Sequence, residues 1–226
     1  MRKSGLASRS REGERGAALI EFTAVMFVLF VFVLGTVDLC LLMVNWASYN
    51  RATYAGARFA VVTNPVATNI NATITANTGS YAGDSCLNSN TGAASGSCVI
   101  KAAAICNATN TAGSAGSCTG GYTFDTVAMP LIVSKMNSAV IIGQLDARQV
   151  TVTYTPTSVG FVSRPNGSPM SVTVSLRCVQ NELFFINYLM RWVLPTPAAC
   201  SGFTPPKGLP LPSFATTLPS EDLTTN

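Results

Sequence analysis

Two acidic side chains lie in the most apolar part of the chain, where a charge has a large energetic cost. Glu21 stands near the start of this stretch and Asp38 near its end. An unpaired charge at bilayer depth costs about 2.5–3.5 kcal/mol or more. Glu21 therefore either reaches water at the membrane surface or pairs with a positive group, which would drive docking. Asp38 lies about 24 Å along the helix from Phe22, so we expect it near the outer interface, where it can reach water and take part in assembly. At 3.6 residues per turn, the two acids lie about 100° apart around a helix, so we expect no shared proton relay.

The stretch that holds these acids predicts a membrane-spanning helix. Residues 22–37 carry no charge, and residues 39–44 extend the apolar run. A helix over residues 17–44 is about 42 Å long, which exceeds the hydrocarbon core of a bilayer, about 30 Å thick. It is also too long for the apolar core of a cleavable signal peptide. The alternative is a buried helix of a soluble domain, but soluble cores rarely hold apolar runs of this length.

The distribution of charge predicts the orientation of this helix. Residues 1–16 hold five basic and two acidic side chains, a net charge of +3, whereas the whole chain carries +4. Basic residues before the helix place the N-terminus in the cytoplasm and the rest of the chain beyond the inner membrane. Trp46 and Tyr49 fall where interfacial aromatic residues are common. The nearly neutral remainder offers no basic face, so we expect no nucleic-acid partner.

Beyond the apolar run, small residues recur at helical spacing. Good helix formers continue to Asn64-Pro65, where the proline disfavours helix at the preceding residue. Ala52, Gly56 and Ala60 are four residues apart, so they share one helix face that another element can approach closely. Two alternatives are open. The face contacts a partner helix during assembly, or it packs on the chain's own outer domain.

The order of these motifs resembles a known family. The matching elements are RGAALIEF at residues 15–22, the acid Asp38 near the end of the apolar helix, and YAGARFA at residues 54–60. They are similar to the TadE-like family, whose members are minor pilins or pseudopilins of tight-adherence (Flp-type) pilus systems. The resemblance covers about one fifth of the chain. It implies work with other pilins and with the pilus assembly machinery at the inner membrane.

The start of the helix also resembles the processing motif of type IV prepilins. That resemblance implies that a prepilin peptidase cuts after Gly16 and that Glu21 becomes the fifth residue of the mature chain, followed by Phe22. Gly16 has no side chain, so an extended backbone there can enter a protease cleft. The cut leaves a positive amino group on Ala17, and Glu21 favours that terminus from one turn away. In an assembly, Glu21 can instead pair with the amino group of a neighbouring subunit.

Six cysteines in the outer part of the chain predict three disulfides in an oxidising compartment. Two separations of 12 residues favour local pairs, and the remaining two cysteines form the third pair: Cys86–Cys98, Cys106–Cys118 and Cys178–Cys200. Closing loops of this size stabilises the fold by about 3 kcal/mol each. A zinc site is disfavoured because the chain has no histidine and no closely spaced cysteine pair. Cys40, in the apolar stretch, is expected to stay unpaired.

Two segments of the outer part alternate β-branched and polar residues, as half-buried strands do. They are QVTVTYTP at residues 149–156 and MSVTVSLRC at residues 170–178. Asn166-Gly167 lies between them and is a strong hairpin signal. We therefore predict an antiparallel hairpin in a small sheet. Part of residues 125–142 can form a helix after Pro130.

Together these features predict an α+β protein with a long N-terminal transmembrane helix and a small disulfide-stapled outer domain. We divide the chain into a basic cytoplasmic leader (1–16), a transmembrane helix with an outer extension (17–64), an outer, periplasmic domain (65–194) and a Pro-rich tail (195–226). We expect the tail to be extended or disordered. The apolar segment 182–194 is too short for a second span. It packs in the core, or it contacts a partner or the membrane surface.

The composition argues against catalysis. A chain without histidine cannot form a Ser-His-Asp or Cys-His site, and the acids of its outer part are isolated in sequence. It also lacks a phosphate-binding glycine loop, so we expect no enzyme, cofactor or metal. The resemblance implies a membrane-anchored minor pilin or pseudopilin that acts in assembly of a tight-adherence pilus or a related secretion system. The alternative is a single-pass anchored periplasmic binding or adhesion protein that is not processed.

Overall fold

The computed structural model describes residues 7–87, 91, 96–181, 183–185 and 209–220 of the chain. The chain divides into two compact units. The helical unit holds residues up to Met43 together with the segment that starts at Leu183. The sheet domain holds residues from Val44 onward, apart from that segment. We describe each unit by itself.

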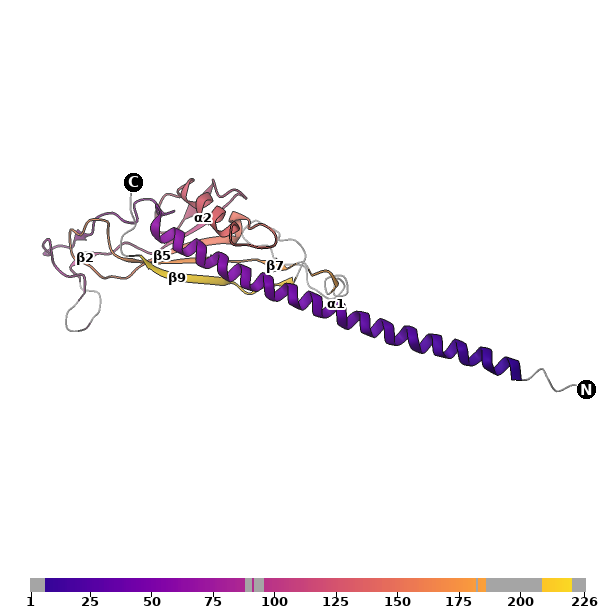
Figure 1. The fold of residues 1–226 in the computed structure, drawn as a ribbon. Helices are drawn as coiled ribbons and strands as arrows, with labels where there is room; N and C mark the ends of the chain where they lie inside the picture. The colour runs from indigo at the N-terminus through magenta and orange to yellow at the C-terminus, as the bar shows by residue number, and fades with distance from the viewer. Residues whose placement is uncertain (1–6, 88–90, 92–95, 182, 186–208, 221–226) are drawn as a thin grey trace, which may run out of the picture. The chain divides into compact units, whose positions relative to one another are not determined.

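The longest element is helix α1, which runs from Ala7 to Val62 (Figure 1). Its end immediately before Asn64-Pro65 confirms the boundary predicted from the proline. Within the described residues, one helical stretch, Ala18–Val62, is long and apolar enough to cross a membrane. Its most apolar window has a mean hydropathy of 2.7, and only 6% of that window is buried. This stretch indicates a single-pass membrane anchor, as the sequence predicts.

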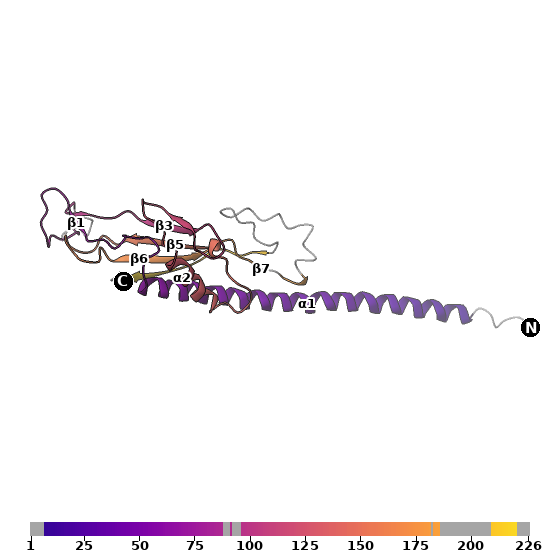
Figure 2. The same cartoon turned by 90° about the horizontal axis from the view of Figure 1, so that it is seen from above.

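The sheet domain is built on a five-stranded antiparallel sheet in the order β4-β3-β5-β6-β9. The strands are β3 (Ala104–Ala108), β4 (Gly116–Cys118), β5 (Val150–Pro156), β6 (Met170–Leu176) and β9 (Phe214–Ser220). In Figure 2, β5 lies between β3 and β6. Strands β5 and β6 pair over their full length, from Val150 with Leu176 to Pro156 with Met170. The predicted antiparallel hairpin is therefore confirmed.

The connection of this hairpin differs from the simplest expectation. Asn166 (φ 61°) and Gly167 (φ 74°) both have left-handed backbones, as an Asn-Gly turn requires. They do not join β5 directly to β6, because the loop between Pro156 and Met170 is longer than a two-residue turn. The loop folds back on an earlier segment. A Cβ on Gly167 would lie 3.0 Å from the carbonyl oxygen of Ala72, so glycine also permits this approach.

The structure of the C-terminal region differs more strongly from the extended or disordered tail that the sequence predicts. Instead of lying apart as a tail, residues 214–220 form strand β9, which pairs with all seven residues of β6. Pro219 is tolerated because β9 is an edge strand of the sheet and need not donate a second row of hydrogen bonds. The other described residues before it include β8 (Leu209–Pro210), which pairs with β7 (Gln180–Asn181).

The core lies on one face of the sheet. Burial alternates along β6, so that Val172 and Val174 are buried while Thr173 between them is partly exposed. Helix α2 (Ala128–Asn137) falls in the predicted segment and contributes Met129, Ile132 and Met136 to this core. It begins before Pro130 and not after it, because proline is tolerated in the first turn of a helix. Strand β6 therefore places its apolar residues inside and its Ser and Thr residues towards the outside.

Two disulfides match the predicted pairs. Cys106–Cys118 joins β3 to β4, where the two cysteines are direct cross-strand partners. Cys86–Cys98 closes a smaller cluster next to the two-residue pair of β1 (Thr75–Ala76) and β2 (Cys98–Val99). Cys178 is also disulfide-bonded, whereas Cys200 lies outside the described residues, so the third predicted pairing stays a prediction. Cys40 is free and exposed, as expected.

Candidate functional site

The predicted processing residues lie inside helix α1. Gly16 and Ala17 are helical, so a protease that requires an extended backbone would have to unwind this part of the helix. Glu21 is exposed, and its carboxylate has no hydrogen bond or ion pair within the described part of the chain. Phe22 beside it is exposed as well. This arrangement leaves Glu21 available to a positive group from another molecule.

Large apolar side chains cover the surface of α1 that follows Glu21. The exposed residues include Val25, Phe27, Val28, Phe30, Phe32 and Val33. The few polar side chains in this part bond to their own helix, as the Thr36 hydroxyl does by donating to the Val33 carbonyl at 2.8 Å. Such a surface is unfavourable in water and suits the hydrocarbon core of a bilayer.

Asp38 differs from Glu21 in being fully engaged within the protein. Its side chain is only 1% exposed, which corrects the expectation that it reaches water. The backbone N–H of Phe184 donates to Asp38 Oδ1 at 3.1 Å, and the N–H of Phe185 donates to Oδ2 at 2.8 Å. Both donors belong to the helical unit. The two acids near the ends of the apolar run therefore have different environments, because Glu21 is exposed and Asp38 is buried and hydrogen-bonded.

The small-residue face packs on the protein's own domain. Ala52 and Ala60 are completely buried in the core of the sheet domain. A Cβ on Gly56 would lie 2.6 Å from Met136 Cγ and 3.4 Å from Val174 Cγ1, so α2 and β6 approach the helix here. Of the two alternatives left open by the sequence, the structure therefore shows the second. The described residues of the sheet domain already occupy the place that a partner helix would need on this face.

Trp46 and Tyr49, the aromatic residues that follow the apolar run, pack against the sheet domain. The rings of Trp46 and Phe214 meet edge to face with their centroids 4.9 Å apart, and the Tyr49 ring lies 5.8 Å from that of Phe214. These contacts join helix α1 to strand β9 inside the sheet domain. Their energetic value, about 0.5–1.5 kcal/mol per pair beyond burial, helps to hold the C-terminal strand.

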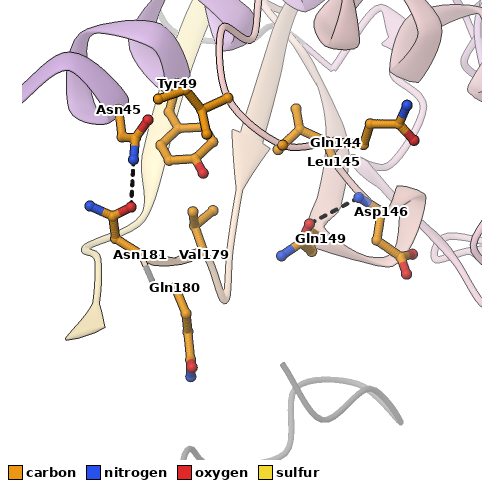
Figure 3. Close-up of a pocket in the computed structure, with 11 residues that line it drawn as sticks. Asn45, Tyr49, Gln144, Leu145, Asp146, Gln149, Val179, Gln180 and Asn181 are labelled. Carbon is orange, nitrogen blue, oxygen red and sulfur yellow. Dashed lines mark hydrogen bonds between the residues drawn. The ribbon is translucent and has the colours of Figure 1, made fainter. Parts of the chain in front are cut away.

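A polar pocket of about 440 Å³ lies between α1, the loop before β5 and strand β7 (Figure 3). Side-chain amides dominate its wall, and the Asn45 Nδ2 group donates to Asn181 Oδ1 at 2.5 Å. The other half of each amide, Asn45 Oδ1 and Asn181 Nδ2, is buried without a partner within the described residues. No sequence motif marks this pocket, because its amides are far apart in the chain.

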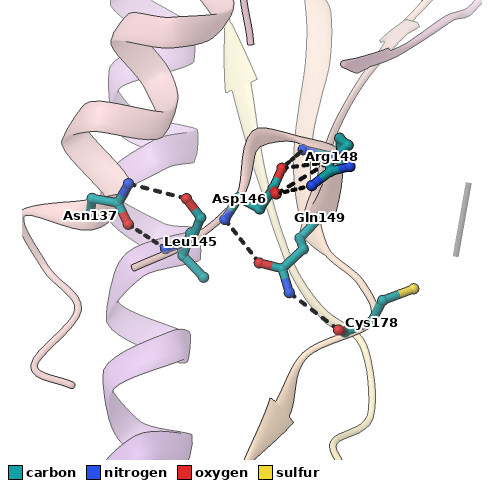
Figure 4. A network of polar contacts seen from close by, with 6 residues as sticks. All are labelled: Asn137, Leu145, Asp146, Arg148, Gln149 and Cys178. Carbon is teal, nitrogen blue, oxygen red and sulfur yellow. Dashed lines mark hydrogen bonds and ion pairs between the residues drawn. The ribbon is translucent and has the colours of Figure 1, made fainter. Parts of the chain in front are cut away.

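The loop at the edge of this pocket is held by a hydrogen-bond network (Figure 4). Asn137 Oδ1 accepts from the Leu145 N–H at 2.6 Å, and Gln149 Oε1 accepts from the Asp146 N–H at 2.9 Å. Arg148 donates to both Asp146 oxygens, and this hydrogen bonding holds the pKa of that carboxyl below its ordinary value. The pocket therefore presents amides and a carboxylate that is paired with Arg148.

Comparison with known proteins adds one match. The family model described as TadE-like protein matches residues 16–58. The match begins at Gly16, includes Glu21 and Asp38, and ends within the helix that carries Gly56, which confirms the resemblance found in the sequence. No curated protein and no solved structure gives a significant match. A TadE-like region over residues 16–58, which lies within the exposed apolar N-terminal helix, indicates a membrane protein related to tight-adherence pili.

Proposed function

We propose that this protein is a membrane-anchored minor pilin or pseudopilin that acts in assembly of a tight-adherence pilus or a related secretion system. Its N-terminus lies in the cytoplasm and its sheet domain in the periplasm. A prepilin peptidase removes residues 1–16, and other pilins and the assembly machinery are its partners. The protein is a structural component and not an enzyme.

One observation carries this proposal. The TadE-like match starts at Gly16 and contains Glu21, which is the one of the two acids in the apolar run whose carboxylate is open. A carboxylate at the start of an apolar helix becomes favourable when a cationic group pairs with it. Cleavage after Gly16 creates such a group, the amino terminus at Ala17, on every subunit. Assembly then satisfies Glu21 of one subunit with the amino group of the next.

The first test is the intact mass of the membrane-extracted protein from cells with and without a prepilin peptidase. We expect a chain that begins at Ala17 only when the peptidase is present. A chain that keeps residues 1–16 in both samples would contradict the processing step. It would favour the alternative, an unprocessed single-pass anchor whose outer domain binds an envelope component or a surface.

The second test addresses the role of Glu21. Zero-length carbodiimide cross-linking of assembled material should join the Glu21 carboxylate to the Ala17 amino group of another subunit. Glu21→Ala should abolish this product and prevent incorporation. The matched control is Thr23→Ala, because Thr23 is exposed on the same part of the helix and its hydroxyl bonds only to the helix backbone. Incorporation of both variants at the wild-type level would contradict the proposed pairing.

A further inference from the structure

We propose that residues 183–185 form a second membrane-contacting element, in which Phe184 inserts among lipid acyl chains and Asp38 holds the element on helix α1. This inference goes beyond the anchoring helix. It does not depend on processing after Gly16 or on pilus assembly.

The first observation is the position of Asp38 in the apolar run. An apolar helix of about 42 Å exceeds a hydrocarbon core of about 30 Å, and Asp38 lies about 9 Å before the end of the run at Val44. These lengths place its carboxylate at the edge of the hydrocarbon core. Because this side chain is also only 1% exposed, its carboxylate requires hydrogen-bond donors from the protein.

The second observation is that the donors are backbone amides. The N–H groups of Phe184 and Phe185 each bond to a different oxygen of Asp38. Backbone amides at membrane depth have the converse requirement, because an N–H without an acceptor there costs several kcal/mol. Asp38 and this short segment therefore satisfy each other, and neither needs water. A hydrogen bond to a charged acceptor is also stronger than one between neutral groups.

The third observation is the exposure of the side chains around this contact. Phe184 is 85% exposed although it follows Leu183, which is buried. Val37 and Leu39 flank Asp38 on α1 and are each 51% exposed. All of these residues belong to the helical unit, and the bond to Asp38 places the backbone of the exposed Phe184 next to the apolar surface of the membrane helix. Lipid is the occupant that such an apolar surface favours.

The test uses the full chain in phospholipid nanodiscs and a single tryptophan as the probe. Phe184→Trp is made in a background with Trp46→Phe and Trp192→Phe, so that only position 184 fluoresces. We expect strong quenching by lipids that carry bromine on the acyl chain and weak quenching by acrylamide in water. The reference for an aqueous position is Tyr81→Trp in the same background, because Tyr81 is 77% exposed in the sheet domain.

The role of Asp38 is tested in the same background. Asp38→Ala should abolish the quenching of the position-184 probe by brominated lipid and expose that probe to acrylamide. Asp38→Asn, which keeps one acceptor oxygen, should give an intermediate result. Thr36→Ala is the matched control, since its hydroxyl bonds only within the helix, and it should change nothing. A separate tryptophan probe, Phe30→Trp with Asp38→Ala, checks that the anchoring helix itself remains in the bilayer.

Two results would overturn the proposal. Quenching of the position-184 probe by acrylamide but not by brominated lipid, with Asp38 intact, would show that the element lies in water. Unchanged lipid quenching of this probe after Asp38→Ala would show that Asp38 does not hold the element there. Loss of lipid contact at position 184, while the probe at position 30 keeps its own lipid contact, is the result that supports the proposal.

Discussion

Two parts of the same helix use their side chains in opposite ways. Between residues 18 and 43, α1 exposes large apolar side chains, and Phe27 is 70% exposed. Between residues 44 and 62, the helix instead buries small side chains, and Ala60 is completely inside the core of the sheet domain. The first part needs an apolar solvent around it, whereas the second needs a sheet and a helix close to its backbone.

This difference shows that one helix can be specified by two independent signals. Hydropathy detects residues 18–43, because every face of the helix there is apolar. Hydropathy says little about residues 44–62, where the informative signal is the four-residue spacing of small side chains. Substitutions of the same type in the two parts should therefore have unequal effects, and the expected differences are given below from the largest to the smallest.

The largest difference in folding free energy between the two parts of the helix is expected for substitutions of glycine. Gly56→Leu would drive a side chain into Met136, whose Cγ lies 2.6 Å from the position of a Cβ, so it should cost about 3 kcal/mol or more of folding free energy. Gly35→Leu is the matched control, because nothing lies within 4 Å of its Cβ position. Chemical unfolding followed by near-ultraviolet circular dichroism measures both. Equal destabilisation by the two variants would contradict the distinction between the two parts.

A similar contrast in the free energy of unfolding is expected between the cysteines of the sheet domain and Cys40 of the helical unit. The double variant Cys106→Ala/Cys118→Ala removes the cross-link between β3 and β4 and should lower the free energy of unfolding by about 3 kcal/mol. Cys40→Ala should leave it unchanged, since Cys40 is free and exposed on the helical unit. Thermal unfolding under non-reducing conditions compares the variants. A strong effect of Cys40→Ala would indicate that this thiol has a structural contact.

A smaller contrast in the free energy of unfolding is expected between a buried and an exposed tyrosine. The buried Tyr154 hydroxyl accepts a hydrogen bond from the Val66 N–H at 2.9 Å, and burial raises the pKa of this tyrosine. Tyr154→Phe leaves that amide without its acceptor and should cost about 2 kcal/mol. Tyr54→Phe, on an exposed position of α1, should have little effect. Unfolding of both variants in denaturant tests this prediction. An unchanged free energy of unfolding in Tyr154→Phe would contradict it.

The smallest effect concerns pH and is confined to the sheet domain. Because Arg148 lowers the pKa of Asp146 in the folded state, their pairing stabilises the protein fully above the unfolded pKa, about 3.9. This contribution to stability is lost as the pH falls through the lower pKa that Asp146 has in the folded protein. Asp146→Asn should therefore cost about 0.5–1 kcal/mol at pH 7 and nothing at strongly acidic pH. A cost that stays constant over the pH range would contradict an ionic origin.

Local sequence patterns anticipated a substantial part of this structure. The proline after Asn64 marked the end of α1, alternation marked β5 and β6, and equal spacing marked two of the disulfides. Each of these features depends on residues that are close in the chain. For strands the pattern is also direct, because side chains that alternate in burial must alternate in polarity.

Contacts between distant residues were not visible in this way. Strand β9 lies in a Pro-rich stretch that lacks a strong strand pattern, yet β6 supplies all of its backbone partners. Asp38 finds its donors at Phe184 and Phe185, far along the chain. Asn45 and Asn181 likewise meet only in the folded domain. No local pattern encodes such partners, since any acceptor or donor of suitable shape would serve.

The sequence by itself determined which part of the chain favours lipid, where the family match stands, and which residues can pair locally. Those properties follow from hydropathy, charge and spacing along a helix or strand. The tertiary structure decided which acid of the apolar run is open and which is engaged, and that the small-residue face belongs to the protein's own core. These outcomes depend on which distant backbone amides and side chains reach each residue, and only the folded chain brings them together.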